Sequence, residues 1–198
     1  MVRKIIAFAG YEGSGKSFRC QQLVKQGNYT KMSFADALRR VAFKSLGFPV
    51  EEGMKQYDWF KLNPCVTLTT QDGASHSITF RKFLEYLGTE GIRTYSKDFW
   101  AHCLLHDIEL LPNEMNVCID DLRFHNEYKY LKQFADEHGY EFEFIFCDYH
   151  SDRYIEHNLH ASARLASFLK EVGYEDGDTI KEDDMQHYIN ALDEVCAV

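Results

Sequence analysis

Prolines are few in this sequence, and paired cysteines and long apolar runs are missing. It has 3 prolines in 198 residues, and its 6 cysteines include no CxxC pair. A zinc site or a disulfide framework is therefore a poor interpretation, and we expect reduced thiols. No segment approaches the roughly 20 consecutive apolar residues of a membrane span, and the N-terminal residues lead straight into a predicted strand. We therefore expect a cytoplasmic protein that does not act at a membrane.

Basic residues are also fewer than acidic ones. The chain has 22 Lys and Arg against 31 Asp and Glu, which gives a net charge of -9. A protein that wraps long nucleic acid by neutralising its phosphates is therefore disfavoured, whereas a small anionic ligand held by a few arginines is not. At this length we expect a single domain over 1–198. No apolar heptad stripe is visible, so the oligomeric state is open, with a homodimer as one alternative.

Strand-like and helix-like patterns alternate along the chain. Apolar or β-rich runs predict strands at 5–9, 29–34, 117–121 and 141–147, with a short further strand at 178–180. Helical spacing of apolar residues predicts helices at 16–26, 36–46, 126–138, 161–172 and 183–195. This alternation predicts an α/β fold with a central parallel sheet of about five strands flanked by helices.

A long insertion separates the second predicted strand from the third. It covers about 35–113, and it contains β-rich runs on both sides of Asp72-Gly73 that predict a hairpin over 64–79. Helical patterns follow, one ending at Gly88 and one ending before Pro112. The role of the hairpin is left open.

The stretch GYEGSGKS, residues 10–17, matches G-x-x-x-x-G-K-[ST] between an apolar strand and a helix. Its glycines allow successive N–H groups to converge on phosphate oxygens at a helix N-terminus. Lys16 would reach the β- and γ-phosphates of ATP, and Ser17 would hold Mg²⁺. The alternative is a tight turn with a surface lysine. We predict that ATP binds to Gly10, Gly13, Ser14, Gly15, Lys16 and Ser17.

A second metal anchor is expected at the end of a neighbouring strand. Asp120 and Asp121 follow the apolar residues Val117 to Ile119 and are both candidates. Strand alternation alone does not choose between them, and a solvated pair of strand-end carboxylates is the alternative. Because the long insertion offers room for an acceptor lobe, we favour phosphoryl transfer to a small acceptor over hydrolysis.

Three further stretches carry a resemblance. They are SFADAL at 33–38, GTEGIR at 88–93 with Trp100 following, and DLRFHNE at 121–127. Together with the loop they resemble the deoxynucleoside monophosphate kinases of bacteriophages, over about residues 3–172. The resemblance implies a P-loop kinase fold with a nucleoside-monophosphate-binding lobe, here 35–113, and a lid, here 148–163. It also implies a location in the host cytoplasm, if a phage encodes the chain.

The resemblance also implies an activity and site residues. Members of this family transfer the γ-phosphate of ATP to a deoxynucleoside monophosphate with Mg²⁺, which yields the diphosphate and ADP. By position in the D-x-R-F-x-N-E stretch, Asp121 becomes the favoured metal ligand beside Ser17. Arg93 and Arg123 become candidate ligands of phosphate.

Transfer between two nucleotides gathers anionic oxygens, and guanidinium groups suit this task because they stay charged and offer paired donors. We predict catalytic roles for Lys16, Arg93, Arg123 and Arg153. The predicted acceptor-binding residues are Phe34, Arg39, Glu90, Arg93 and Trp100. The alternatives are surface ion pairs for the arginines and a place in the core for the aromatic rings. The accepted base is left open.

Two other functions remain as alternatives. The same fold could act on another acceptor, such as a hydroxymethylated base in DNA or a non-nucleotide phosphate. A non-enzymatic switch that senses ATP is the alternative from a different class. It would need no acceptor site, so arginines outside the loop argue against it.

Overall fold

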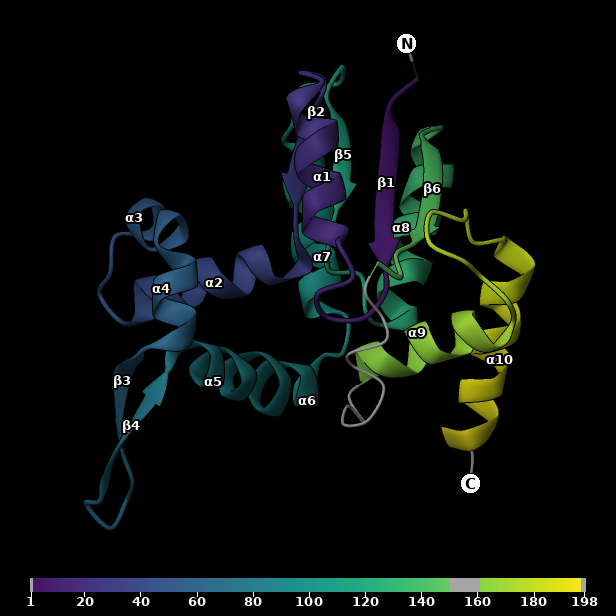
Figure 1. Ribbon diagram of the computed structural model, residues 1–198. Coiled ribbons are helices and arrows are strands. Elements are labelled where there is room, and N and C mark those ends of the chain that lie inside the picture. The colour runs from purple at the N-terminus through teal and green to yellow at the C-terminus, as the bar shows by residue number, and fades with distance from the viewer. Residues whose placement is uncertain (1, 150–160, 197–198) are drawn as a thin grey trace. The chain divides into compact units, whose positions relative to one another are not determined.

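A parallel four-stranded sheet forms the centre of the computed structural model, which describes residues 2–149 and 161–196 (Figure 1). The strand order is β2-β5-β1-β6, and every neighbouring pair is parallel. The strands are β1 (Lys4–Ala9), β2 (Tyr29–Met32), β5 (Asn116–Ile119) and β6 (Glu141–Phe146). The predicted α/β class is confirmed. About five strands were predicted, but residues 178–180 form only an isolated antiparallel bridge between Thr179 and Ile145.

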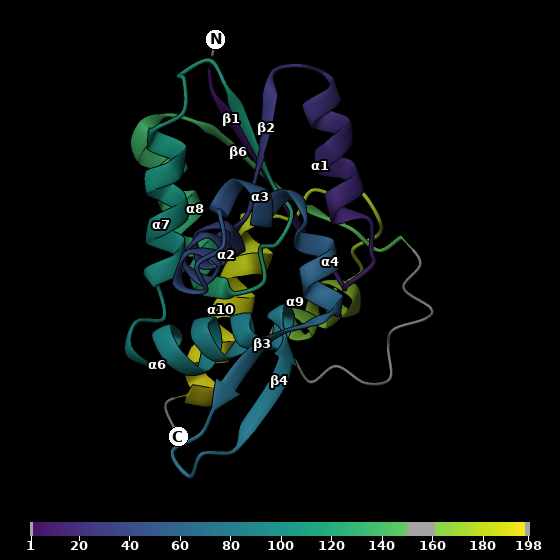
Figure 2. The same ribbon diagram turned by 90° about the vertical axis from the view of Figure 1, so that its left-hand side faces the viewer.

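The central strands are buried, which explains their continuous apolar runs. Ile5, Ala7 and Ala9 of β1 are fully buried, as are Val117 and Ile119 of β5. Helix α1 (Lys16–Lys25) covers one face of the sheet and α8 (His125–His138) covers the other (Figure 2). The chain continues through α9 (Ala161–Glu171) and α10 (Glu182–Cys196). The crossover helices therefore shield both faces, as a parallel sheet requires.

The chain divides into two compact units. The first unit comprises Met1–Phe34 and Leu104–Val198 and contains the sheet, and the second unit comprises Ala35–Cys103. Helix α2 (Phe34–Ser45) starts at the last residue of the N-terminal segment of the first unit, and α7 (Phe99–Glu109) contains the return boundary. The second unit falls within the insertion predicted at 35–113.

Phenylalanine rings form the core of the second unit. Phe43 stacks on Phe80 with ring centroids 4.2 Å apart, and Phe60 meets Phe43 edge-on at 5.3 Å. All three rings are buried, and each contributes roughly 1.5–3 kcal/mol by leaving water. These rings come from α2, α4 (Tyr57–Leu62) and α5 (Phe80–Glu85). The second unit therefore has a hydrophobic core of its own.

Local sequence signals in the second unit were only partly informative. The hairpin predicted over 64–79 is confirmed as β3 (Pro64–Thr69) and β4 (Ser75–Thr79), which pair antiparallel. The short helices α3 (Val50–Lys55) and α4 were not predicted. Each has only six residues, which is too short for a helical period to show in the sequence.

The helix predicted to end at Gly88 does not end there. After α5 the chain continues as the π-helix η1 (Tyr86–Ile92) and then as α6 (Arg93–Tyr95). The N–H of Arg93 donates to the carbonyl of Gly88, five residues earlier. Gly88 is not a capping glycine, because it lies inside η1. A Cβ there would lie 2.6 Å from Cδ2 of Leu38. Gly88 permits close packing of the GTEGIR and SFADAL stretches, and π-turns often occur at functional sites.

Among the residues that the structure describes, no helix combines the length and the apolar character needed to cross a membrane.

Candidate active site

The loop between β1 and α1 has the backbone of a phosphate cradle. Gly10, Gly13 and Gly15 have φ values of 138°, 82° and 90°, which side-chain-bearing residues rarely adopt. Gly15 is the N-cap of α1, so free N–H groups of the first helical turn lie beside the loop. The loop therefore offers backbone donors and the positive end of a helix dipole to an anion.

Lys16 folds back over this loop. Its Nζ donates to the carbonyl oxygens of Gly10 and Tyr11 at 2.8 and 2.5 Å, and lies 3.3 Å from Oγ of Ser14. Burial, together with the nearby charge of Arg123, lowers the pKa of Lys16 to about 8. The ammonium is thus poorly solvated and close to another cation, an arrangement that a bound polyphosphate would relieve. Lys16 is half-buried, which argues against a surface lysine on a simple turn.

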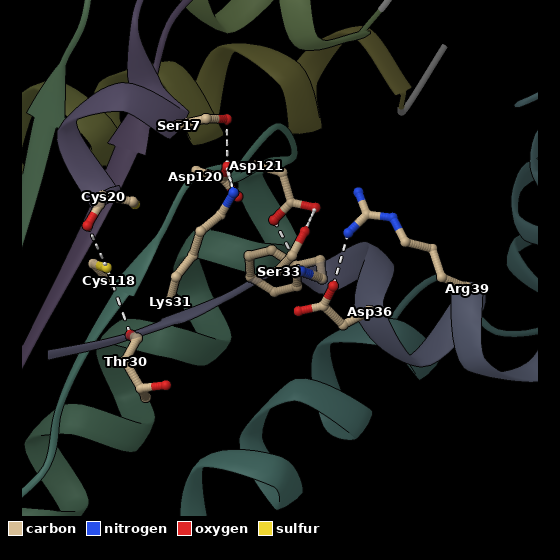
Figure 3. Close-up of polar contacts among 11 residues, drawn as sticks. Ser17, Cys20, Thr30, Lys31, Ser33, Asp36, Arg39, Cys118, Asp120 and Asp121 are labelled. Atoms are coloured by element: carbon tan, nitrogen blue, oxygen red, sulfur yellow. Dashed lines mark hydrogen bonds and ion pairs between the residues drawn. The ribbon is translucent and has the colours of Figure 1, made fainter. Parts of the chain in front are cut away.

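Ser17 and Asp120 meet where two adjacent strands end. Strands β1 and β5 are neighbours in register, so the loop after β1 and the residue after Ile119 lie at one edge of the sheet. Ser17 Oγ donates to Asp120 Oδ2 at 2.5 Å, and Lys31 Nζ lies 2.6 Å from the same oxygen (Figure 3). Hydroxyl and carboxylate oxygens are the donors that Mg²⁺ prefers. The pair therefore fits a magnesium ion carried by a nucleotide.

Sequence reasoning missed Lys31. It lies on β2, which pairs with β5, and it is in register with Cys118. A charged residue within a predicted strand was the available signal, but only the strand order places it beside Asp120.

Asp121 has different partners. Its Oδ2 accepts from Ser33 Oγ at 2.5 Å and its Oδ1 accepts from the N–H of Phe34 at 2.8 Å. The two neighbouring carboxylates therefore contact different elements, Asp120 the start of α1 and Asp121 the start of α2. The resemblance favoured Asp121 as the metal ligand, whereas the structure puts Asp120 against Ser17. This contact favours Asp120, and the choice between the two aspartates as metal ligand stays a prediction.

The rest of the D-x-R-F-x-N-E stretch starts α8. Glu127, 1 % exposed, accepts from the N–H groups of Arg123 and Phe124 through Oε2, at 2.9 and 3.1 Å. This contact satisfies backbone donors at the helix start. The Arg123 side chain is exposed, and its charge acts on Lys16. Arg123 therefore belongs to the same charged site as the loop lysine.

The predicted acceptor residues of the second unit have contacts of their own. Arg39 Nη1 pairs with Asp36 Oδ1 at 2.7 Å, and its guanidinium lies 4.5 Å from the ring centroid of Tyr57. Trp100 is 2 % exposed, and its Nε1–H donates to the carbonyl oxygen of Gly88 at 3.4 Å. Trp100 thus supports the π-helical segment.

The remaining predicted residues are Arg93 and Glu90 in the second unit, Phe34 in the first unit, and Arg153. Arg93 Nη1 is 3.4 Å from the carbonyl of Lys97, and the Glu90 side chain is exposed. Phe34 belongs to the first unit and is 3 % exposed, so its burial, like that of Trp100, favours the core alternative. Arg153 and most of the lid predicted at 148–163 lie outside the described residues.

Within the described ranges, 2–149 and 161–196, no group of three or more His, Cys, Asp or Glu could hold a metal ion. A metal at Ser17 and Asp120 would therefore need phosphate oxygens and water to complete its shell, as Mg²⁺ commonly does in nucleotide sites.

Gly10→Ala tests whether the loop geometry is obligatory. A Cβ at Gly10 would lie 2.1 Å from the carbonyl oxygen of Cys147, and the backbone there has φ 138°. We expect a loss of roughly 3 kcal/mol or more in free energy of unfolding, together with loss of nucleotide binding. Urea denaturation and titration with a fluorescent ATP analogue measure both effects.

Gly27→Ala is the matched control for this substitution. Gly27 also has a positive φ, 90°, but a Cβ added there would meet no atom within 4 Å. It should lose only about 1–2 kcal/mol through backbone strain and keep nucleotide binding. Equal losses in the two variants would show that the contact with Cys147 is unimportant.

The strand–loop–helix geometry, the folded-back lysine and the Ser17–Asp120 pair define a P-loop nucleotide-binding site. Sites of this class hold a nucleotide by its phosphates and by the magnesium ion that accompanies them.

No family model matches the chain. A protein of Acanthamoeba polyphaga mimivirus, described as "Putative deoxynucleotide monophosphate kinase", is 29% identical in an alignment 140 residues long that covers 65% of this chain and 68% of the relative. A mutant of the APS kinase CysC of Mycobacterium tuberculosis is 14% identical, with a TM-score of 0.40 over 87% of this chain and 98% of that chain. The same enzyme in complex with AMPPNP and APS is 14% identical, with a TM-score of 0.38 over 97% of this chain and 98% of that chain.

The P-loop and the mimivirus relative together support a P-loop kinase, and hence a phosphotransferase. The relative comes from a mimivirus, so it supports the kinase class and leaves a bacteriophage origin untested.

Proposed function

We propose that this protein is a deoxynucleoside monophosphate kinase, which transfers the γ-phosphate of ATP to a deoxynucleoside monophosphate and yields the diphosphate and ADP. The observation that carries the proposal is Lys16, folded over the loop in a site that also contains Arg123 and the Ser17–Asp120 pair. The acceptor class is supported by the name of the mimivirus relative and by the resemblance of the GTEGIR and DLRFHNE stretches.

Each candidate site residue of the first unit has a distinct role in this proposal. The loop N–H groups and Lys16 bind the β- and γ-phosphates of ATP, and Arg123 offsets negative charge that spreads over the transferred group. Ser17 and Asp120 hold Mg²⁺ by oxygen atoms. When bound, this ion neutralises phosphate charge and orients the β- and γ-oxygens.

The second unit supplies the acceptor site in this proposal. It has its own core around Phe43 and contains Arg39, Glu90 and Arg93. Arginines suit an acceptor monophosphate because they bind it with paired donors and stay charged. Arg153 remains a proposed contributor. A separate acceptor unit favours a kinase over a hydrolase, because transfer to a second substrate requires a site that excludes water.

The test is ADP formation from Mg-ATP by the purified protein. The acceptors are the deoxynucleoside and ribonucleoside monophosphates, a DNA duplex with hydroxymethylated bases, and a no-acceptor control. We expect ADP only with particular deoxynucleoside monophosphates, and chromatography should show an equal amount of the diphosphate. ADP with the DNA alone would reassign the acceptor, and nucleotide binding without any turnover would support the ATP-sensing switch.

A further inference from the structure

Asp121 forms hydrogen bonds with the residues at which the chain leaves the first unit. It accepts hydrogen bonds from Ser33 and Phe34, which are the last residues of the N-terminal segment of that unit. Strand β2 ends at Met32 and α2 starts at Phe34, so Ser33 alone connects the strand to the helix. Oδ2 of Asp121 accepts from the Ser33 hydroxyl (Figure 3), and Oδ1 accepts from the N–H of Phe34.

This contact is well shielded. Ser33 is 3 % exposed, Phe34 is 3 % exposed and Asp121 is 9 % exposed. Hydrogen bonds to an ionised carboxylate are shorter and stronger than neutral ones, and a buried donor that loses its acceptor is costly. The N–H of Phe34 also belongs to the first turn of α2, where backbone donors lack helical partners and a negative charge is favourable.

The neighbouring carboxylates thus connect different parts of the first unit. Asp120 contacts Ser17 at the start of α1, and Asp121 contacts the start of α2. The helix that begins at Phe34 continues into the second unit, where it contains Arg39. A change in the backbone at Ser33 and Phe34 would therefore pass directly into the element that bears a proposed acceptor ligand.

We propose that Asp121 is a positioning residue that fixes the start of α2, and that it acts on acceptor binding and not on the metal. The consequence for acceptor binding rests on the proposed kinase function. It also gives a reason for the joint presence of SFADAL and DLRFHNE, because Ser33 opens the first stretch and Asp121 opens the second.

Three substitutions test this role. Asp121→Ala removes both acceptors, and Ser33→Ala removes one partner with less risk to the fold. Asp121→Asn keeps an acceptor for the Phe34 N–H, and its amide can donate to Ser33 Oγ. We expect Asp121→Ala to raise the KM for the acceptor about tenfold or more while the Kd of a fluorescent ATP analogue stays within about twofold. Ser33→Ala should raise this KM about threefold.

The conservative variant separates positioning from metal binding. Asp121→Asn should retain acceptor KM and Mg²⁺ dependence within about fivefold of wild type, because position and not charge is needed. The double variant Ser33→Ala/Asp121→Ala should be no worse than Asp121→Ala alone. If Asp121→Asn loses as much turnover as Asp121→Ala and needs more Mg²⁺, Asp121 is a metal ligand and the proposal is wrong.

Amide hydrogen exchange provides a readout that does not depend on activity. Peptides that cover 33–38 should exchange faster in Asp121→Ala and Ser33→Ala than in wild type, whereas the exposed control Asp183→Ala should leave them unchanged. Unchanged exchange in both variants would show that Asp121 does not fix the start of α2, and would overturn the proposal. Faster exchange in a protein that phosphorylates no monophosphate would support the positioning role of Asp121 and refute the proposed function.

Discussion

Lys16→Ala is expected to reduce ADP formation about a thousandfold while the fold stays intact. Lys16 is held by two loop carbonyls and the Ser14 hydroxyl, in the place where the β- and γ-phosphates of a P-loop nucleotide bind. An alanine cannot supply a charge there as the γ-phosphate is transferred. Steady-state turnover with saturating ATP and acceptor measures this loss.

The fold should tolerate this change because the folded protein gains little from the ammonium itself. Burial lowers the pKa of Lys16 to about 8, below its value in the unfolded chain. Below pH 8 the charged side chain therefore carries a desolvation cost that the alanine variant lacks, and this relief offsets the lost hydrogen bonds. The melting temperature at pH 7 should remain close to that of wild type.

Lys25→Ala is the matched control. Lys25 ends the same helix and its side chain is exposed. It should keep wild-type turnover. Wild-type turnover in Lys16→Ala would remove Lys16 from the site, and a large drop in Lys25→Ala would point to a general effect of lost positive charge.

Asp120→Asn is expected to reduce turnover about 10²- to 10³-fold and to raise the Mg²⁺ concentration for half-maximal rate. The carboxylate shares one oxygen between Ser17 Oγ and Lys31 Nζ, and an amide in its place has no negative charge for a cation. Rates measured across a Mg²⁺ titration at fixed ATP report both effects. The change in Mg²⁺ dependence is the specific sign of a metal ligand.

Two companion variants show which contact of Asp120 matters. Lys31→Met removes the ion pair but leaves the carboxylate, so it should change turnover much less than Asp120→Asn. Asp121→Asn should keep the Mg²⁺ requirement within about fivefold of wild type, because Asp121 binds Ser33 and the Phe34 N–H instead of Ser17. Equal effects of Asp120→Asn and Asp121→Asn on Mg²⁺ dependence would contradict the assignment of the metal to Asp120.

Much of the architecture was predictable because its signals are local. The apolar run at 5–9 forms the buried strand β1, and the β-rich run at 141–147 contains the partly buried edge strand β6. The loop glycines lie within one short stretch of sequence. The π-helix was not predictable from such signals, because a glycine in a helical pattern usually indicates a stop. Gly88 instead packs on Leu38, which lies 50 residues earlier in the sequence.

The α/β class, the phosphate loop and the places of Lys16 and Ser17 in it could be predicted from the sequence alone, because these depend on hydrophobic period and on residues adjacent along the chain. Folding of the chain selects which aspartate contacts Ser17, and it brings Lys31 to that carboxylate. Both outcomes depend on the order of β2, β5 and β1 and on the direction of each side chain at a strand end. Two neighbouring aspartates are chemically equal in a sequence, and they differ only when the folded chain gives each one its partners.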